Sequence, residues 1–305
     1  MGHGKVAIIG AGSLGSTVAY SLILRRMVAE ILLVDINTDI LQGQILDLSG
    51  AALGTHTIVR AGTFKEAGQA DIILITADVL KHQHESQLQW AMRSRQLLDS
   101  ITHALLPIQP RAILIVGIDP VDILTRHLQT TVNLPVKQIF GAGCSALNTT
   151  RARHWVAQMS EATTDSSVQL YVMGTRDLPV IGWYSGLVDG LSVSAIPQLT
   201  FHRPLLERIL AADRIKEIKE YKGGAWYGHS AFLVKLIRAA MSKEATIHVL
   251  STYIERFNTC ISMPVILTKD GVKQEVPVPL SPEEQGLLTT AVHQAKKDFD
   301  ETMIS

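Results

Sequence analysis

A glycine-rich segment that directly follows an apolar run constrains this chain more than any other feature of its sequence. The segment Gly10-Ala11-Gly12-Ser13-Leu14-Gly15 comes after Lys5–Ile9 and opens a helical run. Such glycines allow a tight turn, a close approach of the backbone to a pyrophosphate, and close packing of helix on strand, while the helix N-terminus offers N–H groups to the phosphates. Asp35 ends the next apolar run, where a carboxylate binds a ribose 2′-hydroxyl. Because the following Ile36–Asn37 offers no cation for a 2′-phosphate, the pattern predicts NAD rather than NADP; the alternative is a glycine turn in an α/β protein that binds no nucleotide.

The first half of the chain alternates short apolar runs with helical stretches. This order is typical of an α/β fold with a doubly wound parallel sheet, whose strands are buried on both faces. After about residue 150 the pattern changes to that of a mixed α+β domain. We therefore predict a dinucleotide-binding domain over residues 1–146 and a substrate domain over residues 147–305. In the first domain we expect strands at Lys5–Ile9, Glu30–Asp35, Asp71–Thr76, Arg111–Val116 and Gln138–Gly141, with helices such as Ser13–Arg26 and Gln87–Leu105.

The second half contains fewer apolar runs and more turn signals. A strand is expected at Val168–Met173, and a long helical stretch from about Pro204 to Met241, broken at Gly223-Gly224. The Asp-Gly pair between Pro264–Thr268 and Lys273–Val276 predicts a hairpin. Ser281-Pro282-Glu283-Glu284 has the form of a capping box that opens a final helix.

Composition narrows the possible partners and location. The chain has 28 basic and 28 acidic residues, so its formal net charge is zero and no global attraction to nucleic acid or anionic lipid is expected. No run approaches the roughly 18 uncharged apolar residues that a membrane span needs, and the N-terminus enters a strand directly, without a signal peptide. Cys144 and Cys260 are too few for a disulfide framework or a metal site. We expect a cytoplasmic protein that holds no metal and binds neither nucleic acid nor membrane.

Several motifs share their order and spacing with one known family. They are GAGSLG at residues 10–15, GQILDLSGA at Gly43–Ala51, ADIILITA at Ala70–Ala77, DPVDILT at Asp119–Thr125, LNTTRAR at Leu147–Arg153 and KGGAWYG at Lys222–Gly228. With these motifs the chain resembles the lactate/malate dehydrogenases over nearly its whole length. The resemblance implies a Rossmann-type domain followed by the family's C-terminal domain, an NAD site that includes Thr76, Ala77 and Asp119, a carboxylate substrate, and a homodimer or homotetramer.

The catalytic positions depart from that family. Its enzymes move a hydride between nicotinamide and a 2-oxo acid, using a histidine as proton donor. The resemblance places Arg151 on the arginine that clamps the substrate carboxylate. In contrast, Gln87 stands in place of the arginine that polarises the carbonyl, Asn148 in place of the aspartate that orients the histidine, and Asp119 in place of a neutral asparagine. Arg176 takes the position of the histidine itself, in a shortened segment, and cannot donate a proton near neutral pH. We therefore do not expect ordinary lactate or malate dehydrogenase activity.

One histidine is a candidate replacement for the missing proton donor. The usual threonine of the family's late helix is Ala225, and His229 follows four residues later on the same helix face. In the family an aliphatic residue there packs against the nicotinamide, so a histidine is placed to supply a proton; the alternative is a histidine that only fills a helix face. His82 and His84 lie in the expected closing loop and are the alternative histidines that could reach the site; as for metal binding, a solvated loop explains their spacing better.

The same substitutions change the charge of the expected site. Gln87 removes a positive group and Asp119 adds a negative one, which favours a cationic substrate over a developing alkoxide. An iminium ion accepts a hydride without needing a proton, so a cyclic imine whose carboxylate binds Arg151 is one hypothesis; an inward-pointing Arg176 would argue against it.

Three functions remain compatible with the sequence. The first is an NAD(H)-dependent oxidoreductase with a rebuilt site, acting on a carboxylate other than pyruvate or oxaloacetate. The second is an inactive NAD-binding protein, and the third is a non-redox enzyme, such as a lyase or cyclase, that uses the same pocket. Steady NADH consumption, binding without turnover, or product formation without a change in nicotinamide absorbance would distinguish them.

Overall fold

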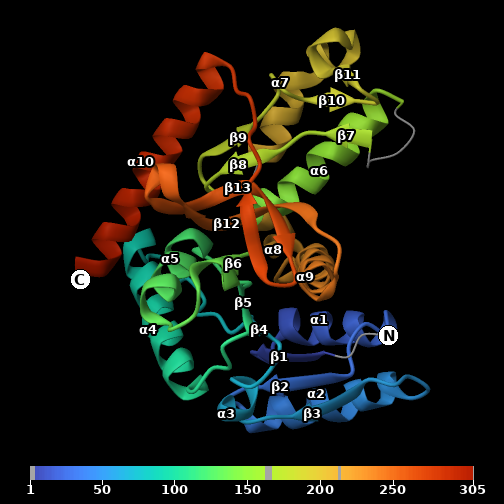
Figure 1. Ribbon diagram of the computed structural model, residues 1–305, viewed down its shortest axis with the longest axis vertical. Helices are drawn as coiled ribbons and strands as arrows, with labels where there is room; N and C mark the ends of the chain where they lie inside the picture. The colour runs from blue at the N-terminus through green and yellow to red at the C-terminus, as the bar shows by residue number, and fades with distance from the viewer. Residues whose placement is uncertain (1–3, 162–166, 212–213, 305) are drawn as a thin grey trace.

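A single large sheet runs through most of the molecule (Figure 1). The computed structural model describes residues 4–161, 167–211 and 214–304. Among these residues the sheet has 11 strands in the order β3-β2-β1-β4-β5-β6-β12-β13-β8-β9, with β14 paired to β13. A separate small sheet has the order β11-β10-β7.

The first six strands confirm the predicted doubly wound parallel sheet. They are β1 (Lys5–Ile9), β2 (Glu30–Val34), β3 (Ile58–Ala61), β4 (Ile72–Ile75), β5 (Ile113–Val116) and β6 (Ile139–Gly141), all paired in parallel. Five of them lie within the predicted ranges, and β3 was not predicted. β3 is a short edge strand in which no residue is fully buried, so it lacks the continuous apolar run that marks a strand covered on both faces.

Alternate residues of the parallel strands pack in two separate hydrophobic cores. In β1, Val6 and Ile8 belong to one core, whereas Ala7 and Ile9 belong to the other. This is the two-residue period of a strand whose two faces are both covered. The first core is covered by α1 (Ser13–Leu24), α2 (Thr38–Ala52) and α9 (Trp226–Met241), and the second by α3 (Phe64–Ala67), α4 (Gln87–Leu105) and α5 (Val121–Thr131).

The second half of the chain joins this sheet rather than forming a detached unit. Its long strand β12 (Thr246–Ile254) pairs antiparallel with β6 through Ser251 and Gly141. Helix α9 also comes from the second half, yet Phe232 and Leu233 share a core with β1. The proposed boundary at residue 146 lies inside α6 (Cys144–Met159). The two halves are therefore continuous in both sheet and core.

The remaining elements agree in part with the sequence. The expected strand at Val168–Met173 is two short strands. The expected helical stretch begins earlier, at Pro197, and is broken at Gly223-Gly224 as predicted; residues 212–213 lie outside the described residues. The hairpin and the capping box are present: β13 pairs with β14, the N–H of Ser281 donates to Glu284 Oε2 (2.8 Å), and the N–H of Glu284 donates to Ser281 Oγ (3.2 Å). The elements are β7 (Val168–Gln169), β8 (Val172–Gly174), β9 (Pro179–Ile181), β10 (Leu187–Val188), β11 (Leu191–Ser192), α7 (Pro197–Ala211), α8 (Arg214–Lys222), β13 (Thr259–Thr268), β14 (Gly271–Glu275) and α10 (Pro282–Ile304).

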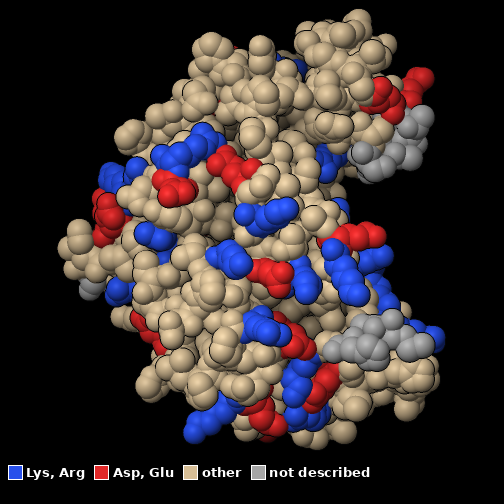
Figure 2. All heavy atoms as spheres, viewed as in Figure 1, with Lys and Arg blue, Asp and Glu red and all other residues tan. Residues whose placement is uncertain are grey.

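The surface shows no large area of one charge on the face in Figure 2, where basic and acidic side chains are intermingled. Within the described part of the chain, none of the helices combines the length and apolar character needed to cross a membrane.

Candidate active site

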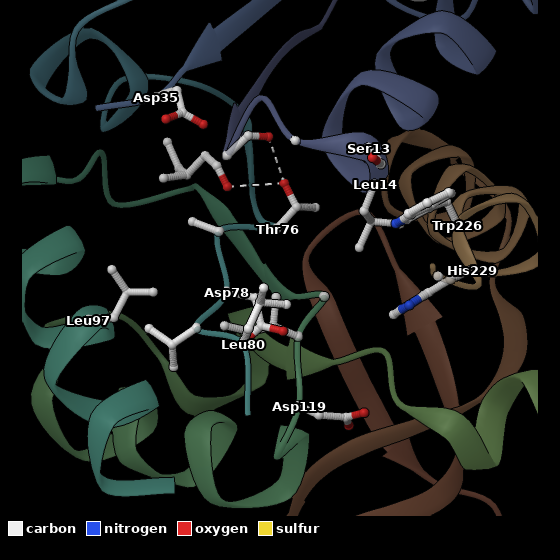
Figure 3. A pocket seen from close by; sticks show the side chains of 18 of the residues that line it. Ser13, Leu14, Asp35, Thr76, Asp78, Leu80, Leu97, Asp119, Trp226 and His229 are labelled. Atoms are coloured by element: carbon white, nitrogen blue, oxygen red, sulfur yellow. Dashed lines mark hydrogen bonds between the residues drawn. The ribbon is translucent and has the colours of Figure 1, made fainter. Parts of the chain in front are cut away.

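A cavity of about 770 Å³ opens at the carboxyl ends of β1, β4 and β5 and is closed on one side by the start of α9 (Figure 3). In doubly wound sheets this is the edge at which nucleotides bind. Of the residues predicted to contact cofactor, Gly15 alone does not line it. The others do: Gly10, Gly12, Ser13, Leu14, Asp35, Ile36, Thr76, Ala77 and Asp119.

The three glycines of the phosphate loop are required for different structural reasons. Gly10 has a φ of +111°, and a Cβ there would lie 2.5 Å from the backbone nitrogen of Ala77. A Cβ on Gly15 would overlap the carbonyl oxygen of Gly10. In contrast, a Cβ on Gly12 would meet no atom within 4 Å. The fold itself requires Gly10 and Gly15, whereas the open space at Gly12 fits a pyrophosphate lying against the backbone.

Backbone N–H groups hold the carboxylate of Asp35 beside the phosphate loop. Its Oδ2 accepts a hydrogen bond from the N–H of Ala11 (2.7 Å) and its Oδ1 from the N–H of Asn37 (2.9 Å). A carboxylate has acceptor capacity beyond these two bonds, so Asp35 retains the capacity to bind a ribose hydroxyl. Ile36 beside it is 86% exposed and brings no positive charge. This environment fits NAD and disfavours the extra phosphate of NADP.

Thr76 links two strands at the base of the cavity through hydrogen bonds. Its Oγ1 donates to the carbonyl oxygens of Ile9 (3.1 Å) and Gly10 (3.0 Å), and these bonds are drawn in Figure 3. The N–H of Ala77 also donates to the carbonyl of Ile9 (2.8 Å). The carboxyl ends of β1 and β4 are thus tied together directly below the phosphate loop.

An ion pair lies at the other end of the cavity. Arg176 Nη1 is 3.1 Å from Asp119 Oδ2, and the two side chains are 32% and 25% exposed. Asp119 follows β5 and precedes α5, whereas Arg176 is in the loop between β8 and β9. The pair therefore joins the dinucleotide half of the molecule to the second half at the reacting end of the cavity.

His229 enters the cavity from α9, beside Trp226 (Figure 3). Its Nε2 lies 3.0 Å from the carbonyl oxygen of Ala142 at the end of β6. Burial lowers the pKa of His229, although the charge of Asp119 and the hydrogen bond to Ala142 both act to raise it. The ring is therefore neutral at pH 7, with the proton on Nε2 donated to Ala142 and the lone pair on Nδ1. Among the described residues that line the cavity, His229 is the one histidine.

Three of the predicted catalytic residues lie outside this cavity. Arg151 Nη1 donates to Asn148 Oδ1 (3.1 Å), because the two residues are one turn apart on α6. Neither is among the described lining residues. Gln87 begins α4 and is exposed, accepting a hydrogen bond from Lys81 Nζ (2.9 Å). His82 and His84 are exposed on the preceding loop.

A smaller cavity of about 250 Å³ adjoins the first and shares Asp119 and Arg176 with it. Gln87 lines this second cavity. The other carboxylates in its lining come from α5, the β8–β9 loop and α10: Asp122, Asp177, Asp298 and Glu301. No group of three or more side chains with metal-binding chemistry is placed to hold an ion anywhere in the described chain.

Asp122 in the second cavity is a perturbed carboxyl group. Burial raises its pKa to about 7, and the nearby carboxylates Asp119 and Asp177 raise it further, although a hydrogen bond from Ser251 Oγ (2.5 Å) acts in the opposite direction. Near neutral pH a substantial fraction of Asp122 is therefore protonated.

Several apolar residues that line the cavity were not predicted from the sequence. Trp226 and Leu147 come from the second half, and Leu80 and Trp90 from the loop and helix after β4. Apolar residues at such positions carry no local signal, because the same residue types fill ordinary cores. For Trp226 the signal was available, since it lies inside the KGGAWYG motif next to Ala225.

The fold and cavity define a two-part, nucleotide-binding α/β protein. Residues 4–141 match the lactate/malate dehydrogenase NAD-binding domain, and residues 145–304 match the lactate/malate dehydrogenase α/β C-terminal domain. The chain belongs to the lactate/malate dehydrogenase family, as its motifs indicated, and its cofactor is NAD.

Named relatives cover almost the whole chain. L-lactate dehydrogenase A of Rhizopus oryzae is 36% identical over 96% of this chain and 92% of its own length. L-lactate dehydrogenase of Chloroherpeton thalassium is 30% identical over 93% of this chain and 95% of its own. Among solved structures, a lactate dehydrogenase from a Medee basin deep-sea metagenome library superposes with a TM-score of 0.92 over 99% of this chain and 100% of that one, at 23% identity. The minor L-lactate dehydrogenase of Enterococcus mundtii gives 0.89 over 98% of both chains, at 25% identity.

Proposed function

We propose that the chain is an NAD(H)-dependent oxidoreductase whose substrate carries a carboxylate and is neither pyruvate nor oxaloacetate. The observation that carries this proposal is the chemistry at the reacting end of the cavity. There an Asp119–Arg176 ion pair and a neutral His229 face the space next to an NAD cradle. Bound NAD supplies or accepts the hydride.

Each of these three side chains has a distinct capability. The guanidinium of Arg176 keeps its charge at all working pH values, so it binds a carboxylate but transfers no proton. His229 holds its Nε2 proton on Ala142, which leaves Nδ1 to accept a proton from the substrate during oxidation. Asp119 places a negative charge beside both.

This arrangement opposes the reduction of a simple 2-oxo acid. Reduction of a ketone builds negative charge on oxygen, and the site would need a proton donor or a cation directed at that oxygen. Asp119 repels such charge, and His229 is neutral at pH 7. Loss of a general acid typically costs a factor of about 10² to 10⁴ in rate. The relatives named as L-lactate dehydrogenases nevertheless make pyruvate the first compound to test.

The test is an NADH oxidation assay with a panel of carboxylates. We expect pyruvate and oxaloacetate to be turned over at least about 100-fold more slowly than a preferred substrate. We also expect His229→Gln to slow that substrate, whereas His293→Gln, exposed on α10 and outside both cavity linings, does not. Efficient turnover of pyruvate, at the 1–10³ s⁻¹ usual for enzymes, would refute the substrate proposal. NADH binding with no turnover of any compound would favour an inactive NAD-binding protein, and substrate conversion without nicotinamide oxidation would favour a non-redox enzyme.

We also infer that the chain assembles into a homo-oligomer through α2. Of the 15 residues of this helix, Leu48 is the one that is buried, whereas Ile40 is 48% and Leu46 66% exposed. Two large apolar side chains left exposed on one helix support an interface there.

A further inference from the structure

We propose that the substrate is zwitterionic at its reacting end, with a carboxylate that binds Arg176 and a cationic nitrogen that binds Asp119. The reaction is then the interconversion of an amine and an iminium ion rather than of an alcohol and a ketone. This inference rests on the proposed NAD-dependent oxidoreductase function and names its substrate class: secondary or cyclic 2-amino acids and their 2-imino forms.

The Asp119–Arg176 pair itself is the first argument. Although Arg176 does line the cavity, its Nη1 lies 3.1 Å from Asp119 Oδ2, so the two side chains present a positive and a negative charge next to each other. A zwitterion placed head-to-tail against them turns one ion pair into two and leaves no charge without a partner. A simple 2-oxo acid anion on Arg176 instead adds a second negative charge next to Asp119 and brings no positive charge to balance it.

The charge balance of both cavities points the same way. Arg176 is the only Lys or Arg among the described residues that line either one. The second cavity, directly beyond the ion pair, adds Asp177, Asp298 and Glu301 to its lining, besides the partly protonated Asp122. The surrounding field therefore favours a positive charge on the substrate next to Asp119 and disfavours a second negative one, such as the distal carboxylate of a dicarboxylic acid.

The position of His229 completes the reaction. His229 and Asp119 face the same part of the cavity (Figure 3). In the oxidation direction, His229 Nδ1 accepts one proton from the substrate ammonium. The carbon–hydrogen bond then breaks with loss of a hydride to NAD⁺, and the nitrogen lone pair forms the C=N bond, which gives the iminium ion and NADH. In reduction the iminium carbon takes the hydride, its π electrons return to nitrogen, and no proton is needed until the amine has formed.

The binding test compares two pairs of ligands that differ in one charge. L-Proline and L-pipecolate carry a ring ammonium, whereas the corresponding tetrahydrofuran- and tetrahydropyran-2-carboxylates have a ring oxygen of similar size. With NAD⁺ present, we expect calorimetry to show at least tenfold tighter binding of one ammonium ligand than of its oxygen analogue. Asp119→Asn should remove that preference, whereas Arg176→Gln should weaken both ligands. NADH fluorescence and thermal melting check that each variant still folds and binds cofactor.

Turnover gives a second readout. We expect NADH oxidation with the five- or six-membered cyclic 2-imino acid, and its kcat/KM to fall at least tenfold in Asp119→Asn. Equal or tighter binding of the oxygen analogues by the wild type, or a preference that survives Asp119→Asn, would overturn the inference. If carboxylates without a cationic nitrogen are turned over with NADH, and the ammonium ligands do not bind more tightly, the inference fails but the proposed oxidoreductase function stands. If NADH is never oxidised, the proposed function fails as well.

Discussion

Gly12→Ala separates the requirements of the fold from those of the cofactor. A Cβ at this position meets no protein atom within 4 Å, and the φ of −68° is one that alanine adopts freely. Alanine is a poorer helix N-cap than glycine, which costs up to about 1 kcal/mol, but it also restricts the unfolded chain and so stabilises by about 0.4–1 kcal/mol. The net change in unfolding free energy is therefore within about 1 kcal/mol, and the Tm should move by less than about 4 °C. The same methyl group fills the space that fits the pyrophosphate, so we expect NADH affinity to fall at least about tenfold, or 1.4 kcal/mol.

Fluorescence titration with NADH and thermal melting measure the two effects separately. Gly286→Ala is the matched control: Gly286 lies within α10, its Cβ also meets nothing within 4 Å, and it does not line the cavity. This control should stabilise the protein by about 0.5–1 kcal/mol and leave NADH affinity unchanged. Wild-type affinity in Gly12→Ala would refute the placement of the pyrophosphate. A loss of several kcal/mol in stability would instead refute the open space at this position.

Three further predictions test other parts of the molecule. Asp35→Ala should weaken NADH binding by about 1.5–3 kcal/mol, the range for a hydrogen bond to a charged group, as measured by fluorescence titration with NADPH as control; an unchanged NADH affinity contradicts the ribose assignment. Because the pKa of Asp122 is raised to about 7 from an ordinary 3.8, the folded state binds the extra proton between about pH 4 and 7 and loses stability as the pH rises through that window. In urea denaturation, the stability of Asp122→Asn relative to the wild type should therefore rise from pH 5 to pH 8, by about 3 kcal/mol; a pH-independent difference excludes this. Leu46→Glu should shift the protein to monomer in sedimentation velocity, whereas a wild type that is already monomeric contradicts the α2 interface.

The elements that were predicted well are those whose signals are local. The phosphate loop, Asp35 and the apolar strands that follow one another in the first half needed only the order of residues along the chain. Strand β12 was missed because its buried face includes Ser251, which is 0% exposed and donates to Asp122, 129 residues earlier. A buried polar residue of this kind interrupts the apolar run, and its partner is visible only in three dimensions.

The catalytic residues show the same limit more clearly. The family resemblance predicts that Arg151 and Asn148 lie at the substrate. In the structure Arg151 Nη1 donates to Asn148 Oδ1 on α6 and neither residue is among the described residues that line the cavity, so their roles stay a prediction. His229 was found because its spacing from Ala225 on one helix is a local property. The contact between its ring and the carbonyl of Ala142 depends on how α9 packs over the carboxyl end of β6. No local pattern in the sequence predicts that packing.

The charges of Asp119 and Arg176 have to be considered together. Considered singly in the sequence, Asp119 adds an uncompensated negative charge and Arg176 replaces a proton donor with a residue that cannot give up its proton. The structure brings these residues, 57 positions apart, to 3.1 Å, so each neutralises the charge that the other introduces. Either residue alone would leave a charge without its partner in a half-buried site, which is costly. The pair therefore places adjacent positive and negative charges in the cavity, which is why we propose a substrate that carries both charges itself.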